Sequence, residues 1–268
     1  MAWSHVNGIR VHWESHGHGE PVLLVMGSGS RGRVWDLHQV PALTAAGYRV
    51  ITFDNRGIPP TDECAGGFTV DDMVADTAAL IEVLEIGPCL AVGTSLGAQI
   101  VQELLLTRPD LVKKAVLMAT RGRADLMRKA MAEAEIALHD SGVKLPQAYA
   151  AVIRATQNLS PRTLADPELA RDWLELLEMA RPMGPGERVQ LNFSAMADRL
   201  SAYRAISRPC HVLAFSDDMI TPPHLGREVA QAIPGATFEL IEDCGHYGYL
   251  ENPDAVNKSI IEYFRRGD

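Results

Sequence analysis

The stretch around Ser95 constrains the fold more than any other part of the chain. Four apolar residues, Cys89–Val92, precede Gly93-Thr94-Ser95-Leu96-Gly97, and a helical pattern begins at Ala98. This order predicts a buried strand, a sharp turn with Ser95 at its apex, and a helix. Glycines two residues before and after the serine fit such a turn, because a Cβ atom at either position would clash with neighbouring backbone. The helix would direct its first amide groups toward whatever binds the exposed hydroxyl.

Patterns typical of strands and helices alternate along most of the chain. Residues 3–8 and 9–16 predict two strands joined at Asn7-Gly8, a dipeptide favoured in hairpin turns. Continuous apolar runs predict further strands at 21–26, 48–53, 89–92, 114–119, 211–215 and 237–241. Such runs are expected where both faces of a sheet are buried. The sequence therefore predicts an α/β fold with a mostly parallel central sheet flanked by helices.

The alternation stops between residues 121 and 206. Four helical stretches follow one another there, near 124–139, 146–158, 167–181 and 186–199. We interpret residues 1–120 and 207–268 as the core, and residues 121–206 as a helical cap inserted over the end of the sheet. The alternative is that these helices extend the core and have no role at a site.

Composition excludes several classes of partner and of site. The chain of 268 residues has a net charge of −9, and no stretch is basic enough to indicate nucleic acid or membrane as a partner. No signal peptide or membrane span is visible, and four widely separated cysteines favour neither a disulfide nor a metal site. We expect a cytoplasmic protein without cofactor or metal. The sequence is compatible with a homodimer.

Two later loops carry the partners that a nucleophilic serine needs. Residues 211–215 are followed by Ser216-Asp217-Asp218, and residues 237–241 by a loop that contains Gly245-His246. Because parallel strands end at one edge of the sheet, Ser95, an acid and His246 are expected to meet there. A serine hydroxyl reacts only when an imidazole takes its proton and a carboxylate orients that imidazole. Either aspartate could supply the carboxylate.

The chain resembles the α/β-hydrolase family in its serine-nucleophile branch with a helical cap. The resemblance covers residues 20–266 and is carried by Gly93-Thr94-Ser95-Leu96-Gly97, Asp218-Met219-Ile220-Thr221-Pro222 and Gly245-His246. It implies that Ser95 is the nucleophile and His246 the base. The family's acid usually lies four residues before the proline, which favours Asp218 over Asp217.

The same resemblance implies an oxyanion hole formed by the backbone amides of Ser28 and Leu96. The family usually has His-Gly before the first of these amides, whereas this chain has Met26-Gly27. This feature gives a weaker likeness to esterases that tailor secondary metabolites. Asp54 and Arg56 are expected to brace the neighbouring loop.

The resemblance therefore implies a cofactor-independent serine hydrolase that cleaves a carboxylic ester or thioester through an acyl-enzyme. The apolar side chains of the insertion favour a medium or large apolar small molecule, either an acyl or a polycyclic compound. One alternative is C–C bond cleavage, acyl transfer, elimination or cofactor-free oxygen chemistry by the same three residues. A second alternative is a non-catalytic ligand-binding protein with this fold.

Overall fold

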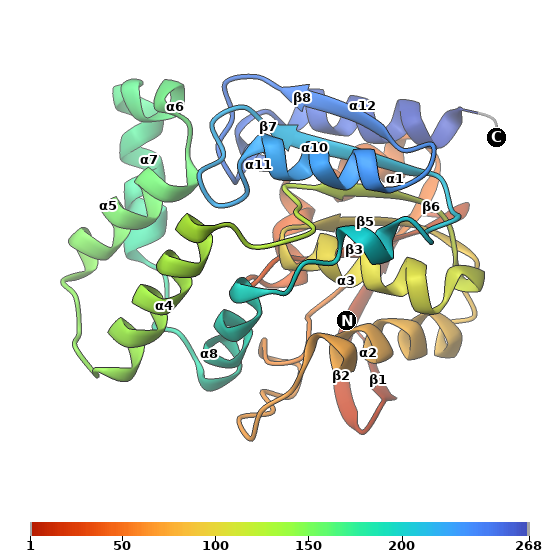
Figure 1. The fold of residues 1–268 in the computed structure, drawn as a ribbon, viewed down its shortest axis with the longest axis horizontal. Coiled ribbons are helices and arrows are strands. Elements are labelled where there is room, and N and C mark those ends of the chain that lie inside the picture. The colour runs from red at the N-terminus through yellow and green to blue at the C-terminus, as the bar shows by residue number, and fades with distance from the viewer. Residues whose placement is uncertain (1, 267–268) are drawn as a thin grey trace.

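The computed structural model describes residues 2–266 and is built around one eight-stranded sheet (Figure 1). Its strand order is β1-β2-β4-β3-β5-β6-β7-β8. The strands are β1 (Ala2–Val6), β2 (Ile9–His16), β3 (Glu20–Val25), β4 (Tyr48–Phe53), β5 (Cys89–Thr94), β6 (Val112–Met118), β7 (Cys210–Phe215) and β8 (Thr237–Ile241). Strand β2 pairs antiparallel with both β1 and β4, and the pairs from β4 to β8 are parallel. The predicted mostly parallel sheet is confirmed.

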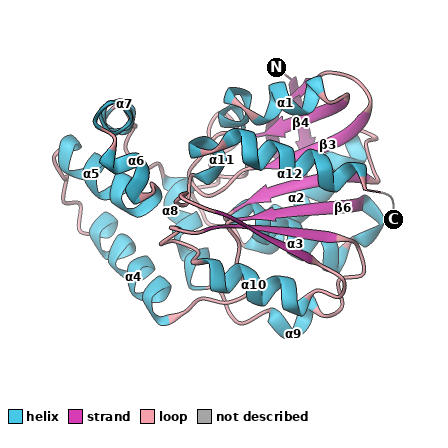
Figure 2. Ribbon diagram, turned by 90° about the horizontal axis from the view of Figure 1, so that it is seen from above, coloured by secondary structure: helices cyan, strands magenta, loops and turns pink. Residues whose placement is uncertain are grey.

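Helices cover both faces of this sheet (Figure 2). One face packs against α2 (Val70–Val83), α3 (Leu96–Thr107) and α10 (Pro223–Ala232), and the other against α1 (Gln39–Ala45) and α12 (Pro253–Arg265). The short helices η1 (Gly32–Leu37), η2 (Pro109–Leu111) and α11 (Gly248–Glu251) connect these elements. None of the helices in the described part of the chain has the length and apolar character that crossing a bilayer requires.

The apolar runs of the sequence are continuous because each of these strands packs side chains into a core on both faces of the sheet. Along β3, Leu23 and Val25 point into the core on the α3 side, whereas Val22 and Leu24 point into the core on the α12 side. Successive side chains of a strand alternate between faces, so a strand covered on both sides needs apolar residues throughout. All six residues of β5 are buried for the same reason.

Local sequence signals account for one turn and for the start of one helix. Asn7 and Gly8 adopt φ angles of 46° and 81° in the turn between β1 and β2, the left-handed conformation that Asn-Gly favours. Helix α2 begins with a capping box, in which Thr69 accepts from the Asp72 amide and the Asp72 carboxylate accepts from the Thr69 amide.

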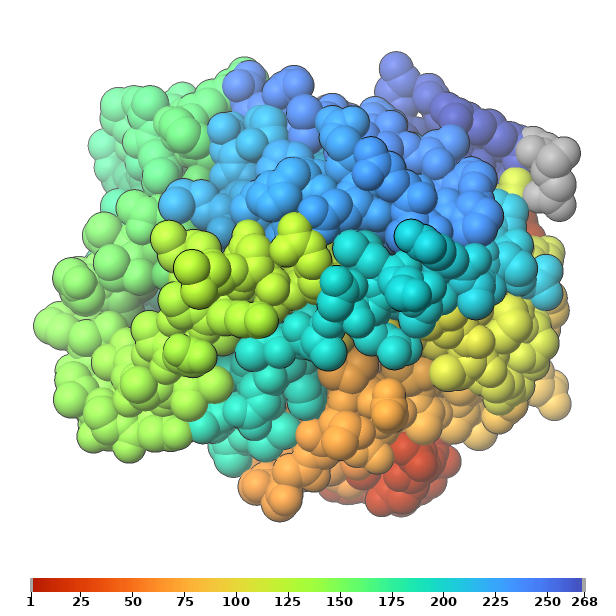
Figure 3. Space-filling model, viewed as in Figure 1, coloured from red at the N-terminus to blue at the C-terminus, as the bar shows by residue number. Residues whose placement is uncertain are grey.

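The segment 121–206, predicted as a helical insertion, contains no strand, and its residues 126–178 lie on one side of the molecule (Figure 3). It contains α4 (Leu126–Asp140), α5 (Gln147–Asn158), α6 (Pro161–Ala165), α7 (Pro167–Glu178), α8 (Pro185–Leu191), η3 (Asn192–Ala195) and α9 (Leu200–Tyr203). Helices α4 to α7 lie apart from the sheet layers (Figures 1 and 2).

The last part of the insertion differs from the sequence prediction. The helix expected near 186–199 ends at Leu191, and the chain continues as a 3-10 turn and an extended segment. The extended segment brings Arg199 onto α3, where its guanidinium donates to both oxygens of Glu103 at 2.9 and 2.7 Å. Tyr203 and Ile206 then pack within the core on the α3 side. The chain therefore rejoins the core before residue 206.

We predict that the buried ion pair between Arg56 and Asp76 stabilises the packing of the first hairpin on α2. Asp76 accepts from Arg56 at 2.6 and 2.7 Å and from Asn7 at 2.9 Å, and its side chain is 3% exposed. Replacing Asp76 by alanine leaves the buried guanidinium unpaired and should cost about 3 kcal/mol, seen as a lower Tm. The exposed pair Lys113–Glu20 gives the control, and Glu20→Gln should cost less than about 1 kcal/mol. Equal losses in the two variants would contradict the prediction.

Candidate active site

Ser95 occupies a strained turn between β5 and α3. Its φ and ψ angles are 55° and −119°, and it is the N-cap residue of α3. A non-glycine residue at positive φ costs on the order of 1–3 kcal/mol, and such strain is retained where the surrounding structure imposes it. Ser95 is half-buried, while its neighbours on both sides are buried. The turn therefore presents the serine at the carboxyl edge of the sheet, as the sequence predicts.

Two glycines make this turn possible. A Cβ atom on Gly93 would lie 2.5 Å from the carbonyl oxygen of Gly97, and one on Gly97 would collide with the backbone carbonyl of Val25. Helix α3 thus starts in direct contact with the ends of β3 and β5. A Cβ atom on Gly27 would lie 3.2 Å from that of Ser95, so the loop after β3 passes beside the serine.

His246 and Asp218 form a buried pair in the loops after β8 and β7. The ring Nδ1 of His246 lies 2.8 Å from Oδ2 of Asp218, and the Asp218 side chain is fully buried. Three further bonds fix the carboxylate: Oδ1 accepts from the amides of Ile220 and Thr221 at 2.8 Å, and Oδ2 accepts from the Thr221 hydroxyl at 2.7 Å. The carboxylate thus holds the imidazole by Nδ1, which leaves Nε2 for proton transfer.

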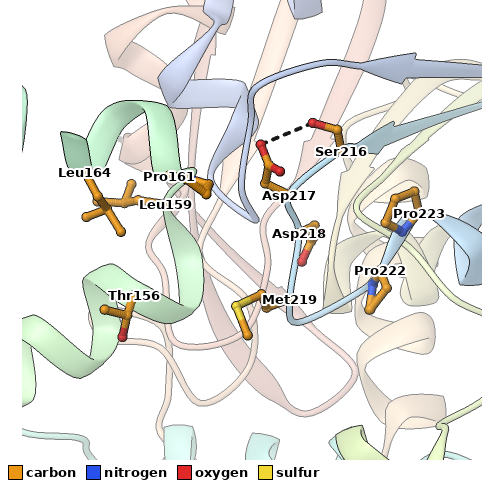
Figure 4. A pocket seen from close by; sticks show the side chains of 10 residues that line it. All are labelled: Thr156, Leu159, Pro161, Leu164, Ser216, Asp217, Asp218, Met219, Pro222 and Pro223. Carbon is orange, nitrogen blue, oxygen red and sulfur yellow. Dashed lines mark hydrogen bonds between the residues drawn. The ribbon is translucent and has the colours of Figure 1, made fainter. Parts of the chain in front are cut away.

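The neighbouring Asp217 is directed elsewhere. Its carboxylate accepts from the Ser216 hydroxyl at 3.3 Å, and its side chain points away from that of Asp218 (Figure 4). No bond joins it to His246 among the described residues. Of the two aspartates left open by the chemistry, the structure therefore pairs Asp218 with the histidine.

Strands β5, β6 and β7 bring Ser95 to the same sheet edge as this pair. The Ser95 amide donates to the Met118 carbonyl at 3.0 Å at the end of β6, and the Ala119 amide donates to the Leu213 carbonyl at 3.0 Å in β7. Within residues 2–266, Ser95 and His246 share no direct hydrogen bond. Bonds between a serine and its base often tighten only when substrate is bound.

The predicted oxyanion donors lie on either side of Ser95. Leu96 opens α3, so its amide is one of the first-turn groups without a partner inside the helix. Ser28 follows Gly27 in the loop after β3 and is exposed, and its hydroxyl donates to Gln190. Within the described chain, no group of three or more His, Cys, Asp or Glu side chains could hold a metal ion.

Gln190 and Asn55 bind the loop after β3, which carries the predicted oxyanion donor Ser28 and is called the oxyanion loop below, and no sequence pattern indicated either residue. The Gln190 side chain accepts from the Ser28 hydroxyl at 3.1 Å and from the Gly29 amide at 2.9 Å, and donates to the Arg56 carbonyl at 2.9 Å. Asn55 donates to the Met26 carbonyl at 2.8 Å. Hydrogen bonds from the Gln190 and Asn55 side chains thus brace the loop without a histidine at position 26. Gln190 lies in α8, 162 residues from Ser28, so no local pattern indicates it.

Asp54 braces the neighbouring segment as expected, whereas the Arg56 side chain does not. Asp54 accepts from the Gly32 amide at 2.7 Å at the start of η1 and lies 2.9 Å from Nδ1 of His12. Arg56 donates instead to Asp76 on α2 and to the Asn7 carbonyl in the first hairpin.

Glu251 joins the loop that contains His246, called the histidine loop below, to the insertion. No sequence pattern indicated this residue. One of its oxygens accepts from the Gly245 amide at 2.7 Å, and the other from the amide and hydroxyl of Ser160 at 2.9 and 2.8 Å. The Tyr247 amide donates to the Asn158 carbonyl at 3.0 Å. A Cβ atom at position 245 would lie 2.5 Å from that same carbonyl oxygen, which accounts for the glycine before His246.

Tyr247 extends the contact between the histidine loop and the insertion. Its ring stacks on Trp173 of α7, with centroids 6.0 Å apart, and burial raises the pKa of its hydroxyl. The aromatic ring next to His246 is therefore packed against the insertion.

Comparisons with known proteins agree with this arrangement. The model of the alpha/beta hydrolase family matches residues 18–259. The chain belongs to the alpha/beta hydrolase family. It is 49% identical over 257 residues to a protein of Mycobacterium tuberculosis named as a candidate non-heme bromoperoxidase, BpoC, covering 96% of this chain and 98% of that one.

Two further comparisons agree with membership of this family. The crystal structure of BpoC matches with a TM-score of 0.91 and 48% identity over 95% of each chain. A protein of Azorhizobium caulinodans named as a candidate carbamate hydrolase, RutD, is 27% identical over 98% of each chain.

A cavity of about 380 Å³ lies between the insertion of this hydrolase and the loop after β7 (Figure 4). It is lined by Thr156, Leu159, Pro161, Leu164, Ser216, Asp217, Asp218, Met219, Pro222 and Pro223. The cavity borders Asp218, but neither Ser95 nor His246 lines it. Its wall is mainly apolar, and both the insertion and the core contribute to it.

We predict that the turn at Ser95 does not tolerate a side chain at Gly97. Gly97→Ala places a methyl group against the Val25 backbone, which cannot move without breaking the sheet, and should cost at least about 3 kcal/mol. Gly66→Ala is the control, because nothing lies within 4 Å of a Cβ atom there. Thermal unfolding of the two variants measures the difference. A Gly97→Ala protein as stable as the control would disprove the proposed close contact.

Proposed function

We propose that this protein is a cofactor-independent serine hydrolase that cleaves a carboxylic ester or thioester. The observation that carries the proposal is the buried His246–Asp218 pair, 2.8 Å apart, at the sheet edge where the strained turn presents Ser95. Membership of the alpha/beta hydrolase family supports hydrolysis as the reaction class. A protein that only bound a ligand would not need a carboxylate held by four hydrogen bonds behind a histidine.

In the proposed mechanism, His246 Nε2 takes the proton of the Ser95 hydroxyl as Oγ attacks the carbonyl carbon. The amides of Ser28 and Leu96 stabilise the oxyanion, each contributing about 3 kcal/mol to the transition state. His246 then gives the proton to the leaving oxygen or sulfur. Water attacks the acyl-enzyme with the same histidine as base, which releases the acid and restores Ser95. Asp218 holds the imidazole and stabilises its cation throughout.

The insertion supports a medium or large substrate with apolar character. Most of the exposed large apolar side chains of the described chain lie in it, including Met127, Tyr149 and Met179 at 66, 54 and 76% exposed. Contiguous exposed apolar surface commonly marks a ligand or partner site. Methionine side chains adapt to irregular apolar ligands. We propose that residues 121–206 act as a cap whose apolar side chains receive the apolar part of the substrate.

Halide oxidation is a second candidate, because the relative at 49% identity carries the name of a non-heme bromoperoxidase. This candidate predicts bromination of an activated diketone that depends on both bromide and hydrogen peroxide. Ester hydrolysis in the absence of peroxide, with no bromination in its presence, would favour the hydrolase.

We predict that Ser95 alone reacts with a fluorophosphonate probe, because it alone has the turn and the nearby histidine–aspartate pair. Intact mass should show one adduct, and peptide mapping should place it on Ser95. The same protein should hydrolyse p-nitrophenyl esters, with longer or aromatic acyl groups preferred over acetyl. A label on Ser28 or Ser30 that persists in Ser95→Ala would overturn the assignment.

We predict that Asp218→Asn lowers kcat/KM by several orders of magnitude with little change in Tm. The amide can still fill the space but disrupts the imidazole tautomer that proton transfer needs. Asp217→Asn is the matched control, because its carboxylate contacts Ser216 rather than His246, and it should change kcat/KM less than about threefold. If Asp217→Asn is instead the variant that loses kcat/KM by orders of magnitude, the assignment of the acid is wrong.

A further inference from the structure

Arg121, in the segment after β6, has no role in the mechanism above. Strand β6 lies between β5 and β7, so this segment leaves the sheet edge between the strand that ends at Ser95 and the strand that leads to Asp218. The Arg121 guanidinium is close enough to the Asp218 carboxylate to interact with it electrostatically. Thr94 pairs with Met118 and the Ser95 amide donates to the Met118 carbonyl, so a ligand bound at Ser95 would lie beside the segment that begins three residues before Arg121.

The backbone around Arg121 is held firmly. Its carbonyl accepts from the side chain of Gln102 on α3 at 3.2 Å, and the next carbonyl, of Gly122, accepts from the Arg199 amide at 2.7 Å. The guanidinium Nη2 donates to the Ser194 carbonyl in η3 at 3.0 Å. The side chain is thus fixed between the core and the insertion before any ligand binds, which favours a binding role.

Arg121 lacks a counter-ion. Among residues 2–266 no carboxylate forms an ion pair with it, and its Nε and Nη1 have no hydrogen-bond partner. The neighbouring Arg128 adds to the positive charge, although Glu135 pairs with that guanidinium at 2.9 Å, and the carboxylates of Asp125 and Asp218 offset part of the charge from a distance. Burial, together with the Arg128 charge, lowers the pKa of Arg121 to about 10, so it still carries a full charge at neutral pH. The Arg121 side chain is half-buried, so its remaining N–H groups can bind an anionic ligand in place of water.

We propose that Arg121 binds a carboxylate of the substrate, so that the substrate class is an ester or thioester that also carries a free carboxylate. This inference rests on the proposed hydrolase function. A guanidinium that gives only one hydrogen bond to the protein keeps N–H groups that can bind a single planar carboxylate. A dianionic phosphate would need a second cation, and the nearest one is already paired with Glu135. The substrate is then amphipathic, with its apolar part toward the insertion.

The test uses matched pairs of p-nitrophenyl esters on the full-length protein. Mono-esters of dicarboxylic acids from five to eight carbons are compared with esters of the corresponding monocarboxylic acids. A second pair places the carboxylate on the alcohol, as 4-carboxyphenyl against phenyl hexanoate. We expect wild type to favour the acidic member of at least one pair by about tenfold or more in kcat/KM, the size of a charge-assisted hydrogen bond. In Arg121→Met that ratio should fall toward one.

Arg123→Met is the control, because Arg123 lies in the same segment but is already paired with Glu228 at 2.7 and 2.8 Å. It should keep the wild-type ratio. Should Arg121→Met fail to fold, inhibition of wild-type hydrolysis of the neutral ester replaces it: adipate should compete at least tenfold better than 1,6-hexanediol.

Two outcomes would overturn the carboxylate site. One is no preference for the acidic ester in wild type, and the other is an unchanged ratio in Arg121→Met, which would assign Arg121 a purely structural role. Failure of the proposed function looks different. In that case neither member of any pair is hydrolysed and Ser95 takes no fluorophosphonate label.

Discussion

The close approach of α3 to the ends of β3 and β5 is the constraint on which the site depends. The backbone of Gly97 touches the Val25 carbonyl, and Gly93 touches Gly97 in turn. This packing forces Ser95 to a φ angle of 55°, since the chain must turn from strand to helix in one residue. The strain is supported by strands and a helix that are buried on every side. Contacts between backbone atoms thus set the position of Ser95.

The helical insertion is joined to this site at two points. In α8, Gln190 binds the loop that carries Ser28, and at the start of α6, Ser160 shares Glu251 with the loop that carries His246. A displacement of the insertion would therefore strain the hydrogen bonds that hold both the oxyanion loop and the histidine loop. The proposed cap is in this way coupled to the geometry of the proposed chemistry as well as to the shape of the substrate.

Charge and apolar surface are distributed unequally around the site. The insertion carries most of the exposed large apolar side chains, whereas Arg121 supplies a positive charge without a counter-ion at the sheet edge. An amphipathic substrate would satisfy both features at once. The net charge of −9 for the whole chain gives no hint of this local cation.

The sequence by itself determined the sheet, the turn at Ser95 and the order of the three proposed catalytic residues. These follow from local rules: apolar runs for strands covered twice, glycines where backbones touch, and polar residues just after strands. The family resemblance favoured Asp218 over Asp217, and the tertiary structure shows the pairing of Asp218 with His246, because two adjacent carboxylates differ in the direction in which they point. The tertiary structure alone revealed Gln190, Glu251 and Arg121, whose roles depend on partners far away in the chain. The helix predicted to reach residue 199 ends at Leu191, and the chain beyond it crosses to α3, where Arg199 pairs with Glu103, a contact that no local pattern indicates.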